Sequence, residues 1–310
     1  MKNLILDVDT GVDDAFAIMF AARHPEINLL GITCVDGNTN LPQVVKNTLK
    51  VLDAAQAAVV PVAAGATRPL IDEPKYAEHV HGADGLADLG TPDSTREIDP
   101  RTAVELLRDL VESSDQPVTL VPLAPLTNVA LFLRSYPESA KKLERIVLMG
   151  GSSEVGNATA TAEFNIWHDP EAAAVVFKSG VPITMYGLDV FNQIKMSNTH
   201  ADQLMGSNGE CAQFAGKLIS HFIQRVSREV TLGDYGAVAV ALFPELATMQ
   251  QYKVVVDTTF GPNRGQTVCD KRGYVASELS GHHLNAPLVD VVMEIDVDEL
   301  RNLWLKTINE

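Results

Sequence analysis

The chain has 310 residues, of which 46% are hydrophobic, and a formal net charge of −16. This is enough apolar material for a large buried core, whereas so acidic a surface repels nucleic acid and anionic membranes. A neutral small molecule or a cation suits such a surface better as a partner.

The three cysteines, Cys34, Cys211 and Cys269, are odd in number and widely spaced, which argues against a disulfide framework or a zinc site. No apolar run approaches the ~20 residues of a membrane span, and the N-terminus lacks a signal-peptide pattern, so we expect a cytoplasmic protein.

Short apolar runs alternate with helical patterns along the first two thirds of the chain. The predicted strands are Asn3–Val8, Asn28–Val35, Pro117–Val121, Arg145–Met149 and Pro182–Tyr186. The predicted helices are Asp13–Arg23, Leu41–Gln56, Leu126–Arg134 and Pro170–Lys178. Strands that alternate with helices are typical of a parallel sheet with helices on both faces. We therefore predict an α/β fold with a mostly parallel central sheet.

The remaining segments are less regular. Gly65–Pro100 is rich in glycine and proline and indicates a long loop or lid. Asn208–Val230 predicts a long helix, Val254–Val297 predicts further strands, and Val297–Lys306 predicts a final helix. Because no repeat, low-complexity segment or flexible linker divides the chain, we expect a single domain spanning residues 1–310.

Polar and glycine residues follow four of the predicted strands. In chain order these segments are Asp7–Asp14, Asp36-Gly37-Asn38, Pro122–Asn128 and Met149-Gly150-Gly151. Ligands of open α/β sheets bind outside the carboxyl ends of the strands. We therefore expect the four segments to meet at one edge of the sheet and to form the functional site.

The first of these segments places four aspartates within eight residues, namely Asp7, Asp9, Asp13 and Asp14. Carboxylates held so close repel and raise each other's pKa values, a cost that a bound divalent cation removes. Oxygen ligands without nearby cysteine or histidine favour calcium or magnesium over zinc. Capping of the following helix explains one or two acids, but not four. We expect Gly11 to let the backbone turn sharply between the two pairs.

Two later segments carry further polar residues. Asp169 before Pro170 predicts a helix N-cap followed by proline at the first helical position. Asn157, Glu163 and Asn165 offer a carboxylate and two amides that suit the hydroxyls of a sugar. Asp234 precedes an apolar helical run and fits either an N-cap or a site residue.

These motifs resemble, in order and across nearly the whole chain, those of the inosine–uridine-type nucleoside hydrolases. The matching segments are Asp7–Asp14, Gly37-Asn38, Pro125–Asn128, Met149–Gly151, Glu163–Asn165 and Asp169–Ala173. The resemblance implies a calcium-dependent enzyme that cleaves the N-glycosidic bond of a ribonucleoside to give ribose and a free nucleobase. It also implies a homodimer or homotetramer.

The resemblance assigns roles by position. The implied calcium ligands are Asp9, Asp14, Asp234 and the backbone carbonyl of Leu123. The implied ribose contacts are Asp13, Asn38, Met149, Asn157, Glu163 and Asn165, and His81 is implied to approach the nucleobase. Asp9 is also the expected general base, which takes a proton from a water that the metal has made more acidic.

One position departs from the family pattern. Many members that cleave pyrimidine nucleosides or inosine carry a histidine immediately before the last aspartate, where it helps to protonate the leaving base. Here that residue is Gly233, which has no side chain to donate a proton. The alternative donors are His81, His221, Arg225 and Tyr235. His221 and Arg225 share a helix face, which favours a structural pair, and we interpret Trp167 as a packing residue.

Two other functions fit parts of the sequence. Asp7-Val8-Asp9-Thr10 matches the DxDxT nucleophile motif of haloacid-dehalogenase-type phosphatases, but that function leaves Asp13 and Asp14 unexplained and lacks a second acid beside Asp234. The glycine at position 233 also allows a non-catalytic, calcium-dependent nucleoside binder. Assays for phosphatase activity and for ribose release distinguish the three functions.

Overall fold

The computed structural model describes residues 1–272 and 286–310, and a nine-stranded sheet forms its centre. The strands are β1 (Lys2–Val8), β2 (Ile27–Cys34), β3 (Val62–Ala64), β4 (Val118–Pro122), β5 (Leu143–Met149), β6 (Ile183–Tyr186), β9 (Ala247–Val256), β10 (Thr267–Asp270) and β11 (Leu288–Ile295). A separate antiparallel pair consists of β7 (Lys195–Met196) and β8 (Val230–Thr231).

The helices of the described residues connect these strands. They are α1 (Val12–Arg23), α2 (Leu41–Ala54), α3 (Glu78–His81), α4 (Ala103–Ser113), α5 (Thr127–Ser135), α6 (Pro137–Ala140), α7 (Phe164–His168), α8 (Pro170–Phe177), α9 (Leu188–Phe191), α10 (Asn198–Met205), α11 (Glu210–Val226), α12 (Gly233–Leu242), the 3₁₀ helix η1 (Pro244–Leu246) and α13 (Val297–Asn309).

The sheet confirms the predicted fold class. Its strand order is β10-β9-β11-β6-β5-β4-β1-β2-β3. The strands from β11 to β3 run parallel, and β9 and β10 add an antiparallel edge. From β1 the chain adds β2 and β3 on one side, and from β4 it adds β5 and β6 on the other side, so the order reverses between the neighbouring strands β1 and β4. In open α/β sheets such a reversal leaves a crevice at the carboxyl ends of the strands, where ligands bind.

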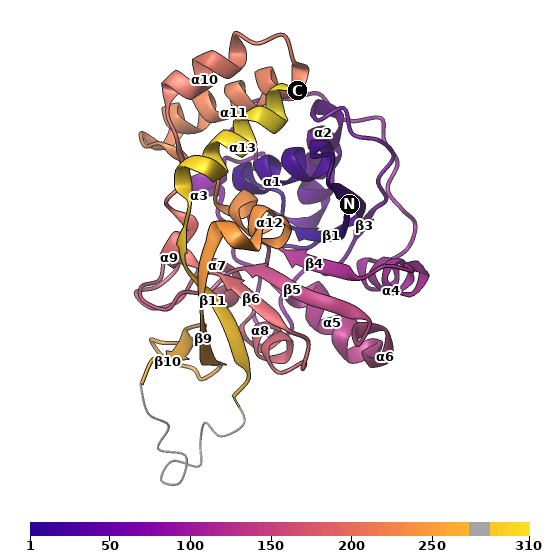
Figure 1. Cartoon of the computed structure of the whole chain (residues 1–310), viewed down its shortest axis with the longest axis vertical. Helices are drawn as coiled ribbons and strands as arrows, with labels where there is room; N and C mark the ends of the chain where they lie inside the picture. The colour runs from indigo at the N-terminus through magenta and orange to yellow at the C-terminus, as the bar shows by residue number, and fades with distance from the viewer. Residues whose placement is uncertain (273–285) are drawn as a thin grey trace.

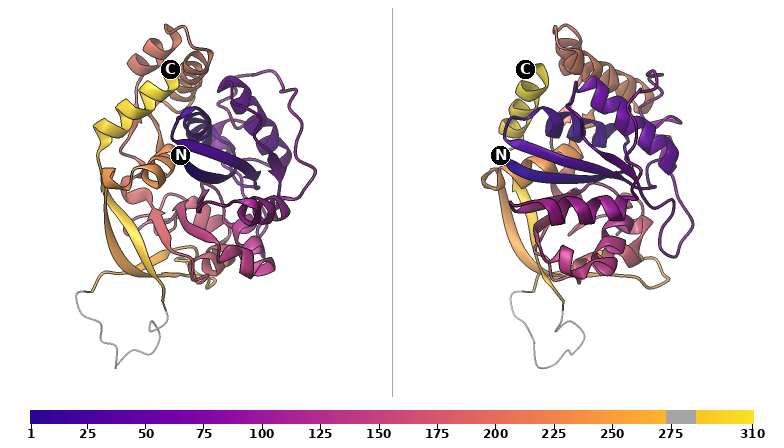
Figure 2. Two further views of the ribbon diagram at one scale, coloured as in Figure 1. Left: turned by 45° about the vertical axis from the view of Figure 1, so that its right-hand side comes forward. Right: turned by 90° about the vertical axis from the view of Figure 1, so that its right-hand side faces the viewer.

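Helices cover both faces of the sheet (Figures 1 and 2). Helices α1, α2, α11, α12 and α13 pack on one face, and α4, α5, α6 and α8 pack on the other. Because β1 and β4 lie between the two layers, Leu4–Val8 and the whole of β4 are buried. Parallel strands that are covered on both faces are typically rich in apolar residues along their whole length, and β1 and β4 fit this pattern.

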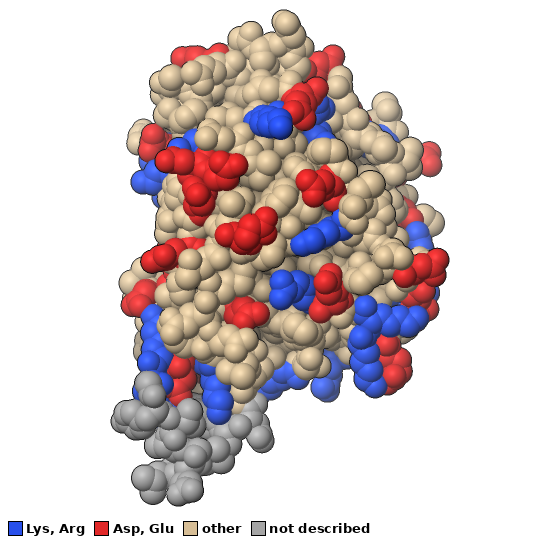
Figure 3. Space-filling view, in the orientation of Figure 1, with Lys and Arg blue, Asp and Glu red and all other residues tan. Residues whose placement is uncertain are grey.

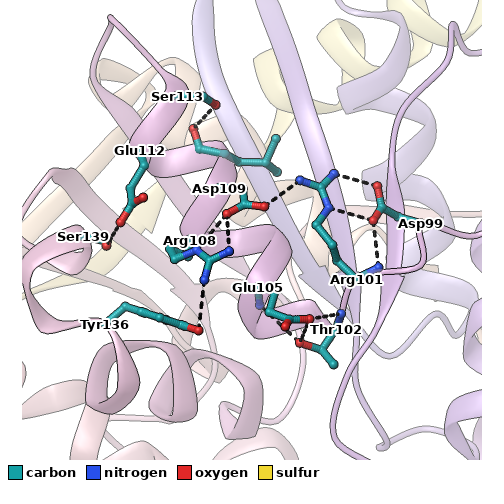
Figure 4. Close-up of polar contacts among 11 residues, drawn as sticks. Asp99, Arg101, Thr102, Glu105, Arg108, Asp109, Glu112, Ser113, Tyr136 and Ser139 are labelled. Atoms are coloured by element: carbon teal, nitrogen blue, oxygen red, sulfur yellow. Dashed lines mark hydrogen bonds and ion pairs between the residues drawn. The ribbon is translucent and has the colours of Figure 1, made fainter.

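Side-chain caps fix where several helices begin. Thr102 and Glu105 form a reciprocal capping box at the start of α4, with Thr102 N–H donating to Glu105 Oε2 at 2.8 Å. Close to this cap, Arg101 and Arg108 pair with Asp99 and Asp109 (Figure 4). Asp169 caps α8 by accepting from Ala172 N–H at 3.0 Å, which confirms the predicted N-cap.

Three segments differ from their predicted boundaries. The helix predicted over Asn208–Val230 begins at Glu210 and ends at Val226, because Ser227 adopts a left-handed conformation with φ 55°. Helix α4 has no counterpart among the predicted helices. The predicted strands over Val254–Val297 correspond to β9, which begins earlier, and to β10 and β11, while residues 273–285 of that segment lie outside the described residues.

Acidic and basic side chains are interspersed on the face of the molecule shown in Figure 3. Within residues 1–272 and 286–310, every helix is too short or too polar to cross a membrane.

Candidate active site

A cavity of about 470 Å³ opens at the carboxyl ends of the central strands. Its lining includes Asp13 in the first turn of α1, Leu123 directly after β4, Met149 at the end of β5 and Asp234 in the first turn of α12. Helices α3, α7 and α9 gather at this end of the sheet (Figure 1). The segments predicted to meet at one sheet edge therefore do meet, at the expected position.

Three carboxylates converge in this cavity. Oxygens of Asp13, Asp14 and Asp234 all lie within 4.8 Å of one another. Asp14 is also the third residue of α1, where its carboxylate accepts from Gly11 N–H at 2.9 Å and from Asp9 N–H at 3.2 Å. Asp14 therefore caps its helix and belongs to the acidic cluster at the same time, so the two interpretations of this residue are compatible.

Asp9 lies beside this group but is not one of its three members. Its Oδ2 accepts from Asn38 N–H at 2.7 Å. Its Oδ1 is buried without a hydrogen-bond partner among the described residues, and the same is true of Asp13 Oδ1. A buried carboxylate oxygen without a donor is costly unless a cation or a ligand hydroxyl satisfies it.

The raised pKa values of these acids reflect the same unfavourable burial of neighbouring carboxylates. Burial, followed by repulsion from Asp14, raises the pKa of Asp9 well above its usual range. Burial and the neighbouring acids do the same for Asp234, and burial together with Asp13 raises the pKa of Asp14 to about 7. A divalent cation would offset this repulsion, and an all-oxygen donor set suits calcium or magnesium. The residues present therefore fit such an ion.

Two glycines allow side chains to approach the acidic turn closely. Gly11 is the N-cap of α1, where the chain passes from β1 into the helix, and its φ of −97° is open to other residues, so the backbone conformation does not itself require glycine. A Cβ there would instead lie 2.6 Å from His81 Nδ1 and 2.7 Å from Asn38 Nδ2. A Cβ at Gly37 would lie 2.1 Å from Asp9 Oδ2. Both positions require glycine for space.

The residues predicted to contact a sugar line the same cavity. Asn165 Nδ2 donates to the backbone carbonyls of Leu123 at 2.9 Å and Met149 at 3.1 Å. The carboxylate of Glu163 accepts the N–H groups of Gly151, Asn165 and Ile166 at 2.9, 2.9 and 3.1 Å. Asn157 Oδ1 accepts from Phe164 N–H at 2.9 Å. These bonds hold the polar side chains in fixed positions.

His81 reaches the site from the long irregular segment between β3 and α4, as part of α3. Its Nδ1 accepts from Val12 N–H at 3.2 Å and lies 3.7 Å from Asp13 Oδ1. Burial lowers its pKa, which favours the neutral ring. A neutral ring that accepts at Nδ1 keeps its proton on Nε2, where it can donate to a ligand.

The other candidates for contact with the leaving base point elsewhere. Arg225 binds the carboxylate of Asp88 and the carbonyl of Glu78, which ties α11 to α3. Tyr235 is buried and its hydroxyl donates to Leu300 O at 2.8 Å. His221 is not among the residues that line the cavity.

Trp167 does line the cavity, so its interpretation as a packing residue is incomplete. The Nζ of Lys75 lies 4.1 Å from the centre of its ring, in a cation–π contact.

Sequence reasoning missed other residues of the cavity wall, including Phe191, Phe222 and Arg228. Phe191 comes shortly after β6, just as the predicted site segments come directly after earlier strands, and this position could have indicated it. Arg228 was hidden because the segment around it was predicted as uninterrupted helix.

Comparisons with known proteins agree with this geometry. A family model for inosine-uridine preferring nucleoside hydrolases matches residues 4–302. A pyrimidine-specific ribonucleoside hydrolase, RihA, of Shewanella baltica is 40% identical over 93% of this chain and 91% of its own. RihA of an Enterobacter species is 39% identical over 95% of this chain and 93% of its own.

Solved structures of the same kind superimpose closely. A purine-preferring ribonucleoside hydrolase from Gardnerella vaginalis has a TM-score of 0.90 and 34% identity, and the match covers 99% of this chain and 98% of that chain. An inosine-guanosine nucleoside hydrolase has a TM-score of 0.91 and 30% identity, with 99% of both chains covered. The chain therefore belongs to the family of inosine-uridine preferring nucleoside hydrolases.

Proposed function

We propose that this enzyme hydrolyses the N-glycosidic bond of ribonucleosides with the help of calcium, releasing ribose and a free nucleobase. The observation that carries the proposal is the acidic cluster of Asp13, Asp14 and Asp234, with the unpartnered Asp9 Oδ1 beside it, in a cavity whose opposite polar residues suit a sugar. The family membership and the names of the relatives support it.

The proposed calcium ligands are Asp9, Asp14, Asp234 and the carbonyl oxygen of Leu123. Asp13 belongs to the same cluster, and we assign it to the ribose, because its unpartnered Oδ1 also lies beside His81. A calcium ion bound there would hold ribose hydroxyls and lower the pKa of a water molecule.

Asp9 is the proposed general base. It is buried, its Oδ2 is occupied by Asn38 N–H, and its Oδ1 is left to accept a proton. Asn157, Glu163 and Asn165 would orient the sugar, with Asn38 and Met149 beside them. As the base departs, positive charge grows on the ribosyl ring, and the surrounding carboxylates stabilise this charge more than the neutral substrate.

The relatives suggest which nucleosides to test first. The Shewanella enzymes are named pyrimidine-specific and the Gardnerella enzyme purine-preferring, so uridine, cytidine and inosine should all be assayed. The cytoplasmic location and the homodimeric or homotetrameric state stay predictions.

A reducing-sugar assay across the five common ribonucleosides, with calcium and with a chelator, tests the proposal. We expect ribose release from at least one nucleoside and its loss on chelation. Tight nucleoside binding without turnover would instead support a non-catalytic binder. Release of phosphate from phosphate esters, without ribose release from nucleosides, would support a phosphatase, which the family membership does not favour.

A further inference from the structure

The ring of Phe191, which lines the cavity, packs directly against the backbone of Gly233. A Cβ on Gly233 would lie 1.9 Å from Cε2 and 2.2 Å from Cζ of the Phe191 ring. Phe191 ends the short helix α9, which Asp189 anchors by accepting from the N–H and hydroxyl of Ser153 at 2.9 and 2.6 Å. No side chain can extend from position 233 while this ring is in place, so help for the leaving base must come from another position.

Four basic side chains line the cavity in the described part of the chain, namely Lys75, His79, His81 and Arg228. Lys75 lies over the Trp167 ring and 3.7 Å from Asp72. Val12 N–H occupies Nδ1 of His81, which leaves this ring one N–H donor, at Nε2. Arg228 differs from the two histidines, because a guanidinium group carries several N–H donors in one plane and a permanent positive charge.

The backbone holds Arg228 at the cavity rim. The left-handed Ser227 ends α11 immediately before it, and strand β8 begins two residues after it with Val230, which pairs with β7. Phe222, Val230 and Thr231 line the same cavity. Within residues 1–272 and 286–310, the guanidinium makes no hydrogen bond or ion pair, although its charge helps to lower the pKa of His81. Its donors are therefore available to a ligand.

We propose that Arg228 stabilises the departing nucleobase by donating N–H groups to a carbonyl oxygen of the base, and so favours bases that carry such an oxygen. This inference rests on the proposed function. When the bond between C1′ and the base nitrogen breaks, its electron pair leaves with the base and spreads onto the ring and its carbonyl oxygens. The water oxygen forms the new bond to C1′, its proton passes to Asp9, and the released base takes a proton from solvent.

The chemistry predicts a substrate class. Uracil and hypoxanthine carry carbonyl oxygens that can share the negative charge and accept from a planar guanidinium. Adenine has no carbonyl oxygen. Uridine and inosine should therefore depend on Arg228 more strongly than adenosine does.

The experiment compares two leaving groups. Wild type, Arg228→Ala, Arg228→Lys and the matched control His79→Ala are assayed on uridine and inosine and on 4-nitrophenyl β-D-riboside, whose nitrophenolate leaves without help. Removing one such donor typically costs about 10²–10³ in kcat. We expect Arg228→Ala to lose activity in this range on uridine or inosine, Arg228→Lys to lose less, and all variants to retain activity on the nitrophenyl riboside. Added guanidinium ion should partly restore Arg228→Ala on the nucleosides.

Several results would overturn the proposal. An equal loss on both kinds of substrate would indicate a role in folding or in sugar binding, and no loss on either would show that Arg228 is not used. A loss confined to nucleosides in His79→Ala, with Arg228→Ala unaffected, would assign the role to His79. If wild type failed on the nitrophenyl riboside and on every nucleoside, the hydrolase function itself would be wrong.

Discussion

Acidic side chains occur in two contrasting regions of this molecule. At the carboxyl edge of the sheet, Asp9, Asp14 and Asp234 are buried together, and their pKa values are raised. Beside α4, Asp99 and Asp109 accept from Arg101 at 2.7–3.0 Å, and their pKa values are lowered (Figure 4).

The difference is the presence of a cation within hydrogen-bonding distance. Arg101 forms a two-bond pair with Asp99 and a further bond with Asp109, so the network beside α4 neutralises its own charge. The sheet edge supplies backbone N–H groups but leaves Asp9 Oδ1 and Asp13 Oδ1 without a hydrogen-bond donor among the described residues. The network beside α4 is complete as the chain folds, whereas we propose that a cation from solution completes the sheet edge.

The largest expected effect follows from making the same substitution in both regions. Asp9→Asn removes the proposed general base and should lower kcat by about 10²–10⁴. Asp109→Asn alters the network beside α4 and should leave kcat unchanged, as should His221→Ala. Ribose release with saturating calcium measures all three. Equal losses for Asp9→Asn and Asp109→Asn would remove the functional distinction between the regions.

A second substitution addresses cation binding directly. Asp234→Asn removes one carboxylate charge from the proposed site and should weaken calcium binding by at least about tenfold, because affinity follows the number of charged ligands. Asp99→Asn is the matched control and should bind calcium as wild type does. Calorimetric titration of chelator-treated protein provides the measurement. Unchanged affinity in Asp234→Asn would place the ion elsewhere.

The two regions also predict opposite responses to pH. Burial raises the pKa values of Asp7, Asp14 and Glu163 to about 7 in the folded chain. The calcium-free folded state therefore binds more protons than the unfolded state between about pH 4 and 7, and its stability should fall as the pH rises through this window. The lowered pKa values beside α4 affect stability only below this window.

Melting curves at pH 5.5 and pH 8, each with chelator and with calcium, test this expectation. The chelated protein should have the lower Tm at pH 8, and calcium should raise Tm more at pH 8 than at pH 5.5. A chelated Tm that stays level or increases towards pH 8 would show that the acids at the sheet edge carry no such cost.

The smallest effect is expected beside α4. Arg101→Ala breaks a partly exposed network, and exposed ion pairs contribute little to stability, so Tm should fall by no more than about 3 °C. Nucleoside hydrolysis should not change. A large loss of activity in Arg101→Ala would show that the network beside α4 also contributes to hydrolysis, which would contradict the expected difference between the two regions.

The sequence was informative where a local pattern decides the structure. The buried strands, the acidic turn after β1 and the Asp169 cap follow from runs and spacings that can be read directly, and these predictions are confirmed. Patterns could not show that a Cβ at Gly11 would collide with His81, because the two residues come from different segments.

Long-range contacts and rare backbone conformations account for the rest. The contact between Phe191 and Gly233 joins α9 to α12, and neither residue signals it alone. A serine in the left-handed region has no strong sequence signature, so the end of α11 at Val226, and with it the position of Arg228, could not be anticipated.

The acidic cluster joins Asp14 of the first helix to Asp234 of the twelfth. Strands β2 to β6 of the central sheet lie between them along the chain, so the two carboxylates meet only when this part of the sheet has formed. A cation that binds there selects the completed structure and has little affinity for earlier intermediates. It would therefore act mainly on the rate of unfolding and leave the rate of folding almost unchanged, which makes occupancy of the site a determinant of the lifetime of the folded enzyme.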